Sequence, residues 1–264
     1  MEESARNSIP VSAFMITFNN ERTLERALES LTWADEIVVV DSFSTDRTPE
    51  IARQYADTFL QREWPGFRDQ YQFAAENCTH EWVVFADADE VVTDQLADEI
   101  RAELQQNSSR SPDDRIHGYY ANRTTWYIDR WIKHGGWVPD REIRLYNRNK
   151  GSWQGGLHAC VKVEGREGCL RHIYLHYTYA DIGDHLRTIN RYSQTAAKEL
   201  HEANKRFSLL RLLTRPPWRF VRDYFLKRGF LDGVPGLILA VNTMFYVFAK
   251  ESKLYERQLG DKQE

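Results

Sequence analysis

Cysteine is scarce in this chain: only three of its 264 residues are cysteines, and none belongs to a C-x-x-C pair. An odd number of widely spaced cysteines does not support a disulfide framework. A zinc site would have to combine Cys160, Cys169, His172 and His176. Their spacing lacks the closely paired cysteines that mark zinc knuckles. The first residues also lack the pattern of a secretory signal, so we expect a protein of the reducing cytosol.

Long apolar segments are also missing. The stretch at residues 234–249 contains 16 uncharged residues, which as a helix would extend about 24 Å. The hydrocarbon core of a bilayer is roughly 30 Å thick. Pro235, Gly236 and Asn242 weaken the stretch further. We therefore do not expect this segment to cross a membrane.

Charge is unevenly distributed along the chain. The net charge is −4, yet residues 205–228 contain eight Lys or Arg residues and one acid, Asp223. This segment carries +7, so the remainder carries −11. No module that reads nucleic acid accompanies it, which disfavours a nucleic-acid partner.

Within the basic segment, arginines alternate with Leu, Phe and Trp, which is typical of a helix lying on a membrane surface. The side chains expected to contact an anionic leaflet are Arg215, Trp218, Arg219, Arg222, Lys227 and Arg228. Packing of the apolar residues against the rest of the chain, or against a second subunit, is the alternative.

The first hundred residues alternate between strand and helix patterns. Apolar runs predict strands at 11–18, 37–40, 58–60 and 82–86. Apolar residues at helical spacing predict helices at 21–31, 48–55, 68–77 and 94–105. Thr48, which precedes a proline, and Thr93 are expected to cap two of these helices. The alternation predicts an α/β fold with a mostly parallel sheet covered by helices.

Three of the predicted strands end in polar residues. Thr17-Phe18-Asn19 follows the first strand, Asp41-Ser42 the second, and Asp87-Ala88-Asp89 the fourth. Ligands bind beyond the carboxyl ends of parallel strands, so we expect these segments to meet at one edge of the sheet. Asp87 and Asp89 share a face of an extended chain. Two such carboxylates can share Mg²⁺ or Mn²⁺, with substrate phosphates completing the ligand shell.

Other interpretations of these acids stay open. A glycosidase acid/base pair needs carboxyls about 5–9.5 Å apart across a sugar, which neighbours in one strand do not provide. Glu90 and Asp94 precede a helix and would complement its dipole. Plain solvated loop acids are the third interpretation, because D-x-D alone is a weak motif.

In their order and spacing, TFNNE at 17–21, DSFSTDRT at 41–48 and DADE at 87–90 resemble the family 2 glycosyltransferases. That family has the GT-A fold, which binds nucleotide-diphosphate sugars. The resemblance implies donor contacts from Thr17, Phe18, Asn19, Glu21, Asp41, Ser42, Arg68, Gln72, Asp87 and Ala88. It implies a divalent cation, Mg²⁺ or Mn²⁺, held by Asp87, Asp89 and His176.

The sequence departs from the family pattern at two places in the donor half. Phe43 stands where the family commonly has glycine. Tyr71 stands where a lysine or arginine is common, so Arg68 would take over the phosphate contact.

WVPDREIRLY at 137–146 resembles a segment of lipopolysaccharide-core glucosyltransferases within the same family. The resemblance implies that Asp140 is the base that deprotonates the acceptor hydroxyl, with Glu142 as the alternative. Arg144 would neutralise charge on the leaving diphosphate. A surface Asp–Arg ion pair is the structural alternative. Glu90 and His158 are further expected near the acceptor, although Ala159 replaces the glutamate that usually follows this histidine.

The resemblance implies an inverting transfer of a hexose, with UDP-glucose as donor, onto a lipopolysaccharide-core heptose. The enzyme would be a peripheral, monotopic protein at the cytoplasmic face of the bacterial inner membrane. Transfer to polyprenyl phosphate or another lipid-linked oligosaccharide is one alternative, and a catalytically silent sugar-nucleotide-binding homologue is another. Processive polymer synthesis is disfavoured because the chain has no Q-x-x-R-W motif.

We expect two regions along the chain. Residues 1–184 would form the GT-A catalytic domain, divided into a nucleotide-sugar half (1–105) and an acceptor half (106–184). Residues 185–264 would form a helical region at the membrane interface.

Overall fold

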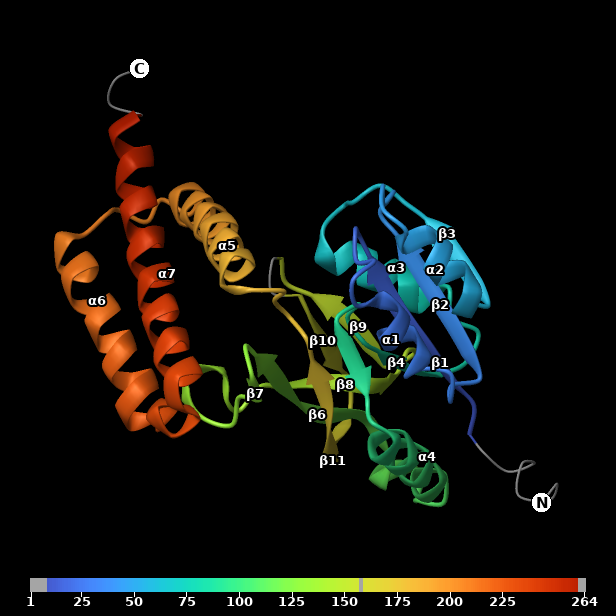
Figure 1. Cartoon of the computed structure of the whole chain (residues 1–264). Coiled ribbons are helices and arrows are strands. Elements are labelled where there is room, and N and C mark those ends of the chain that lie inside the picture. The colour runs from blue at the N-terminus through green and yellow to red at the C-terminus, as the bar shows by residue number, and fades with distance from the viewer. Residues whose placement is uncertain (1–8, 157–158, 261–264) are drawn as a thin grey trace. The chain divides into compact units, whose positions relative to one another are not determined.

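The computed structural model describes residues 9–156 and 159–260 (Figure 1). It divides into two compact units, which are considered separately. Unit 1 comprises the chain up to Arg123 together with Asp140–Tyr177, and unit 2 comprises Thr124–Pro139 and the chain from Thr178 onward. The sequence predicted a single boundary after residue 184, whereas the two units divide at residues 123, 139 and 177. Thr124–Pro139 belongs to unit 2 because Tyr127 and Ile132 share a small apolar core with Leu239.

Unit 1 is built on a mixed sheet with the strand order β3-β2-β1-β4-β8-β6-β11-β5. The strands are β1 (Val11–Thr17), β2 (Glu36–Asp41), β3 (Thr58–Gln61), β4 (Trp82–Phe85), β5 (Glu90–Val92), β6 (Ile116–Tyr127), β8 (Arg141–Asn147) and β11 (Arg166–His176). The first four strands pair in parallel, as predicted. β8 pairs antiparallel with β4 and β6, and β11 pairs antiparallel with β5, so the sheet is mixed rather than mostly parallel.

Helices cover both faces of the parallel half (Figure 1). They are α1 (Leu24–Glu29), α2 (Thr48–Tyr55), α3 (Phe67–Glu76) and α4 (Asp94–Ser108). One face of β1 packs in a core with α1, α2 and α4. The other face packs with α3 and a separate hairpin, β9 (Gly151–Gln154) and β10 (Cys160–Val163). Because β1 is buried on both faces, its sequence is a continuous apolar run rather than an alternating one.

Of the two predicted helix caps, one is confirmed and one is wrong. The Thr93 hydroxyl accepts a hydrogen bond from the backbone N–H of Leu96, as an N-cap residue should. Thr48 lies inside α2, and its hydroxyl instead accepts the backbone N–H of Asn20 at 2.7 Å. The side chain of Thr48 therefore ties the loop after β1 to the start of α2.

Unit 2 is mainly helical. Its helices are α5 (Ile182–Glu202), α6 (Leu209–Val221) and α7 (Gly233–Gly260), and α7 packs against both of the others. The π-helical turn η4 (Arg222–Leu226) and the 3₁₀ turn η5 (Gly229–Asp232) connect α6 to α7. The short strand β7 (Arg130–Trp131) pairs with the end of β6, and η3 (Gly135–Trp137) follows it.

The apolar C-terminal helix is longer than predicted. Pro235 and Gly236 lie in the first turn of α7, where proline removes no helical hydrogen bond, so they do not shorten it. Among the described residues, the segment Gly229–Gly260 is long and apolar enough to cross a membrane, by length and composition only. The stretch at 234–249 on which the expectation rested is therefore part of a longer helix, and its length alone does not argue against crossing.

A buried polar network fixes α5 and α7 within unit 2. The Tyr127 hydroxyl lies 2.8 Å from Nδ1 of His185, and the Asn242 side-chain amide lies 3.0 Å from the same nitrogen. Both groups can donate only if Nδ1 is unprotonated. Burial lowers the pKa of His185 to about 4.

We predict that unit 2 loses stability as the pH falls from 6.5 to 4. Over this range His185 takes up a proton in the unfolded chain before it does so in the folded one, which favours unfolding by up to about 3 kcal/mol. Denaturant titrations across this range should show the loss in the wild type and a reduced loss in His185→Gln. His80→Gln, in unit 1, is the matched control and should keep the wild-type slope. Identical slopes for the wild type and His185→Gln would contradict the prediction.

Candidate functional site

Three neighbouring strands end at one edge of the sheet, as the sequence predicts. β1 lies between β2 and β4. Thr17 is paired in register with Asp41, and its hydroxyl donates to the Asp41 carboxylate at 3.0 Å. Asp87 and Asp89 follow β4 directly. The polar strand ends therefore come together beyond the carboxyl ends of the parallel strands.

Asp41 is wholly buried at this edge. Its carboxylate accepts hydrogen bonds from the Thr17 hydroxyl, the Ser44 backbone N–H (2.9 Å) and the Gln61 side chain (3.0 Å). The neighbouring Ser42 hydroxyl accepts a bond from Gln70. These two expected donor contacts thus anchor the loop after β2.

Asn19 and Glu21 join the loop after β1 to the loop after β2. The Asn19 side-chain carbonyl accepts the backbone N–H of Thr45 at 2.9 Å, and the Glu21 carboxylate accepts that of Arg47 at 3.1 Å. Asn19 takes a left-handed backbone conformation, which asparagine tolerates better than most residues. The two loops therefore form one hydrogen-bonded rim.

Two phenylalanines stand exposed on this rim. Phe18 is 58% and Phe43 51% exposed. Phe43 has a φ of 59°, the left-handed region in which glycine is favoured and a bulky side chain is an outlier. The backbone therefore keeps the glycine conformation although the side chain is aromatic. Such local strain is typical of functional sites.

The acids after β4 meet two arginines from the antiparallel strands. Arg144, on β8, forms a bidentate pair with Glu90 at 2.8 and 2.9 Å, and both side chains are buried. Arg123, on β6, donates to Glu90 at 2.6 Å and through Nε to Asp140 at 2.7 Å. Two guanidinium groups therefore lie among the carboxylates and offset their mutual repulsion.

The surroundings shift the pKa values of Asp87 and Glu90 in opposite directions. Burial by itself would raise the pKa of Glu90, but Arg144 and Arg123 lower it below its usual value. Burial raises the pKa of Asp87, and the nearby charge of Glu90 raises it further. The Tyr71 hydroxyl donates to Oδ1 of Asp87. Asp87 is therefore oriented by Tyr71, while Glu90 is the ionic anchor of the cluster.

Asp89 lies beside His176, as predicted. His176 ends β11 opposite Glu90 of β5, and its Nε2 lies 3.2 Å from Oδ2 of Asp89. Burial lowers the pKa of His176, but the carboxylates of Asp89 and Glu90 together outweigh burial and the net shift is upward. The backbone N–H of Tyr177 donates to the Asp89 carbonyl at 2.8 Å, which fixes the two segments together.

The donor set at Asp89 and His176 fits a divalent cation with few protein ligands. One carboxylate and one imidazole leave most of the coordination shell to phosphate oxygens and water, as Mg²⁺ and related ions prefer. Among the residues that the structure describes, no group of three or more His, Cys, Asp or Glu side chains is arranged to hold a metal ion. Asp87, the third expected ligand, is turned toward Tyr71.

The zinc interpretation is wrong: the four residues considered for it, all within the described part of the chain, do not form a zinc site. Cys160 and Cys169 are exposed. His172 bonds the Glu99 carboxylate at 2.9 Å, whereas His176 bonds Asp89. The four side chains therefore serve different local contacts instead of meeting at one ion.

Asp140 and Glu142 lie at the rim of the arginine cluster. Arg123 holds Oδ2 of Asp140, and Oδ1 accepts no hydrogen bond from the described residues. Glu142 is 45% exposed and lies 3.3 Å from Arg144, which is 2% exposed. Asp140 is thus oriented with one oxygen available, whereas Glu142 is more open to solvent.

The other expected contacts are placed as follows. Arg68 is exposed at the start of α3 and pairs with its neighbour Asp69 at 2.7 Å. Gln72 accepts the backbone N–H of Trp153 at 3.1 Å. Ala88 is buried in the core. His158 lies outside the described residues.

Arg123 was not predicted as part of this site, and Tyr71 was named only as a replacement for the family's lysine or arginine. Arg123 is a cation within the aromatic run YYANRTTWY of β6, and a charge inside a largely apolar strand needs a partner. That pattern could have indicated a buried ion pair. Tyr71 stands at a donor-half position of the family pattern, but its bond to Asp87 could not be predicted, because the two residues are 16 positions apart on different elements.

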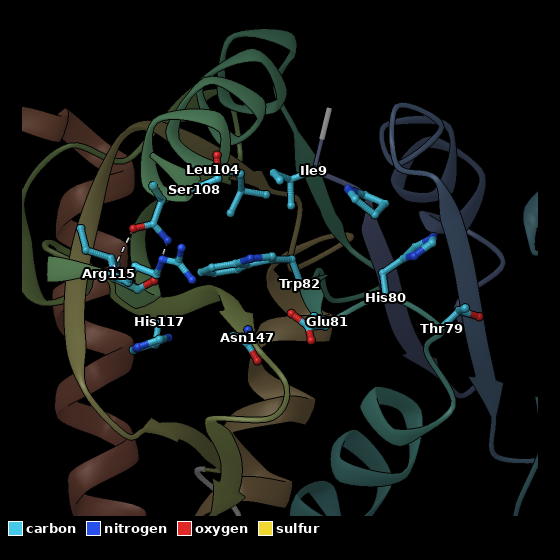
Figure 2. Close-up of a pocket in the computed structure, with 13 residues that line it drawn as sticks. Ile9, Thr79, His80, Glu81, Trp82, Leu104, Ser108, Arg115, His117 and Asn147 are labelled. Atoms are coloured by element: carbon cyan, nitrogen blue, oxygen red, sulfur yellow. Dashed lines mark hydrogen bonds between the residues drawn. The ribbon is translucent and has the colours of Figure 1, made fainter. Parts of the chain in front are cut away.

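A cavity of about 470 Å³ lies elsewhere in unit 1 (Figure 2). It is lined by Ile9, which precedes β1, by Trp82, the first residue of β4, and by Arg115 and His117 at the start of β6. It thus adjoins the amino ends of the parallel strands. Ligands in such sheets bind at the carboxyl ends, so its size does not make it the substrate site.

Comparison with known proteins identifies relatives of this chain. The family described as Glycosyl transferase family 2 matches residues 12–164. The lipopolysaccharide core biosynthesis glycosyltransferase LpsC of Rhizobium meliloti (strain 1021) is 32% identical over 262 residues, which cover 94% of this chain and 93% of LpsC. An uncharacterized glycosyltransferase of Rickettsia typhi is 31% identical over 260 residues, covering 94% and 88% of the two chains.

A solved structure shares the fold. Mannosyltransferase PcManGT from Pyrobaculum calidifontis, in complex with GDP-Man and Mn²⁺, matches with a TM-score of 0.51 and 16% identity, covering 94% of this chain and 87% of that one. The predicted GT-A fold is confirmed. With a family match over more than half of its length and a relative similar along nearly all of it, the chain belongs to glycosyl transferase family 2.

Proposed function

We propose that this glycosyltransferase moves a hexose, with inversion, from a UDP-hexose such as UDP-glucose to a lipid-anchored acceptor such as the lipopolysaccharide inner core. The observation that carries the proposal is that, at the carboxyl edge, Asp89 pairs with His176, while Asp87 and Asp140 both contact Arg123. Similarity to LpsC, named for lipopolysaccharide core biosynthesis, supports the acceptor class. The enzyme would act at the cytoplasmic face of the bacterial inner membrane.

In this proposal Asp89 and His176 hold Mg²⁺ or Mn²⁺, and Asp87 joins them or contacts the ribose. The bound cation would supply positive charge to the leaving diphosphate. PcManGT, which is named with GDP-Man and Mn²⁺, supports a nucleotide-sugar donor and a divalent ion. Arg144 is buried against Glu90, so we assign it the positioning of that acid, because contact with the diphosphate would require it to break this pair.

Asp140 is the proposed base for the acceptor hydroxyl. Arg123 holds one carboxylate oxygen and leaves the other available to take a proton. A base needs a fixed position within hydrogen-bonding reach of the hydroxyl. Glu142 remains the alternative, because it is adjacent and more exposed.

Phe18 and Phe43 are proposed to contact the nucleotide base. Asp41 is buried and fully bonded, so it offers no free group to the base, whereas the rings of Phe18 and Phe43 are exposed on the same rim. Aromatic rings bind bases by stacking, at about 1–3 kcal/mol per base. Such a contact would give the strained conformation of Phe43 a function.

The first test is Asp89→Ala. We expect turnover of UDP-glucose to fall by about 10²–10³-fold, because the mutant loses a ligand to the charge that stabilises the leaving group. Mn²⁺-dependent thermal stabilisation by UDP should weaken in parallel. Asp94→Ala removes an exposed acid from the first turn of α4 and is the matched control. Unchanged turnover in Asp89→Ala would remove Asp89 from the metal site.

The second test separates the two candidate bases. Asp140→Asn should lower transfer by about 10²–10⁴-fold, the usual contribution of general base catalysis, and should preserve donor binding. Glu142→Gln is the matched comparison, expected to retain most transfer. The opposite pattern would exchange the two roles. Loss of donor binding in Asp140→Asn would instead place Asp140 in the donor site.

The third test uses Phe43. Phe43→Gly removes both ring and backbone strain, so the free energy of unfolding should stay constant or rise by about 1 kcal/mol. UDP affinity should fall by roughly 5- to 100-fold through the lost stacking contact. Phe43→Leu keeps the strained backbone without the ring and should lose affinity with no gain in stability. Wild-type affinity in both variants would show that Phe43 does not contact the base.

The donor and acceptor can be identified together. A panel of nucleotide sugars is incubated with the enzyme, Mn²⁺ and a bacterial membrane lipid extract, and the lipids are analysed by mass spectrometry. We expect the mass of one hexose on a core glycolipid with UDP-glucose. A product on polyprenyl phosphate would change the acceptor, and no product with any donor would contradict the proposed activity.

A further inference from the structure

A helical hairpin in unit 2 carries most of the exposed large apolar side chains of the described residues. We define the hairpin as residues 205–248, which contain α6, the turns η4 and η5, and the first part of α7. Figure 1 shows α6 and α7 side by side. A surface of this kind on a soluble protein marks a contact with another molecule or a membrane.

The exposed apolar residues of α7 form one stripe. Val234, Leu237, Val241, Phe245 and Phe248 are spaced three or four positions apart, and each is at least 39% exposed. This spacing places them on one face of the helix. Residues on the opposite face, among them Leu239 and Asn242, are buried.

The turn between α6 and α7 forms an apolar tip with two cations at its centre. Phe225 and Leu226 precede Lys227-Arg228, and Phe230 and Leu231 follow. The four apolar side chains are 45–62% exposed. On α6, Leu210, Leu213 and Trp218 are also exposed. The apolar surface therefore includes both helices and the tip.

The exposed charge of the hairpin is entirely positive. It contains eight Lys or Arg residues and only two acids, Asp223 and Asp232, and both acids are buried. Asp223 pairs with Arg219 and Arg222, and Asp232 accepts the backbone N–H groups of Lys133 and His134. An apolar surface bordered only by cations complements an anionic lipid layer. Two copies of such a surface would repel each other.

Half of these cations are engaged inside unit 2. Arg211 and Arg215 lie 3.5 and 3.4 Å from the buried carboxylate of Glu251 on α7. Arg219 and Arg222 hold Asp223. The electrostatic attraction predicted from the sequence is thereby reduced, and apolar insertion becomes the larger contribution.

The neighbours of α7 favour an orientation in the plane of the membrane. α7 packs between α5 and α6, and α5 has exposed charged side chains along its length, including Arg187, Arg191 and Lys198. A membrane-spanning α7 that kept these contacts would carry those charges into hydrocarbon, at considerable cost. A hairpin lying in the interface would leave α5 in water.

We propose that the hairpin is a monotopic anchor that inserts the tip and the α7 stripe into an anionic lipid surface. Attachment depends mainly on apolar side chains and only secondarily on charge. The inference rests on the proposed function in one respect: it specifies how an enzyme that acts on a lipid-anchored acceptor reaches its substrate.

The test is co-sedimentation of the full-length protein with phosphatidylcholine vesicles that contain phosphatidylglycerol, at about 0.1 M and about 1 M NaCl. We expect the double variant Leu226→Asp/Leu231→Asp to lower the partition coefficient at least tenfold, because two charges would enter the apolar interface. Raising the salt should lower wild-type binding by less than that. Leu186→Asp, an exposed leucine on α5, is the matched control and should bind as the wild type does.

Two outcomes would overturn the proposal. Release of the wild type by salt, with no effect of the two aspartates, would mean that attachment is purely electrostatic. If the wild type does not bind vesicles but forms dimers, and the double variant is monomeric, the surface would instead bind a second copy of the chain. Thermal stabilisation by UDP-glucose and Mn²⁺ is measured in parallel and should be unchanged in the double variant. Vesicle binding without any donor response would contradict the proposed function and leave the anchor intact.

Discussion

The ionic cluster of Glu90, Arg144 and Arg123 is the interaction on which the organisation of unit 1 depends. It joins the segment after the parallel strand β4 to the antiparallel strands β8 and β6. A buried ion pair adds little net stability relative to an apolar one, but loss of one partner leaves an unpaired charge at a cost of about 3–5 kcal/mol. The cluster therefore constrains where the two halves of the sheet meet, which is where the candidate site lies.

The same cluster divides the carboxylates into anchors and available groups. Glu90 has both oxygens engaged by arginines and no exposure to solvent. Among the described residues, Asp89 and Asp140 each have one side-chain partner, and both remain about one-quarter exposed. Available acids can serve a substrate or an ion, whereas the anchored acid keeps them in position. The arginines neutralise Glu90, so the other carboxylates can lie close to it and remain available to a substrate or an ion.

Unit 2 uses buried acids for a different purpose. Asp223 and Glu251 lie inside the helical layer and draw arginines toward them, while Leu, Phe and Trp side chains remain outside. On this part of the unit, the distribution differs from that of a soluble helical bundle, in which apolar residues face inward and charges face water. The proposed contact with a lipid interface would account for the difference, because exposed apolar side chains are stabilised there.

The sequence by itself determined the elements whose signals are local. The apolar runs, the helical spacing and the Thr93 cap lie within a few residues of each other, so the parallel half of the sheet and its polar edge could be predicted. Tertiary structure alone decided the partners. The Thr48 hydroxyl bonds a residue 28 positions away, and Arg123 meets Glu90 across 33. Arg215 meets Glu251 across 36 positions. Charge and hydrogen bonding act through space, so which of several acids each arginine neutralises depends on strand pairing and helix packing that local patterns do not encode.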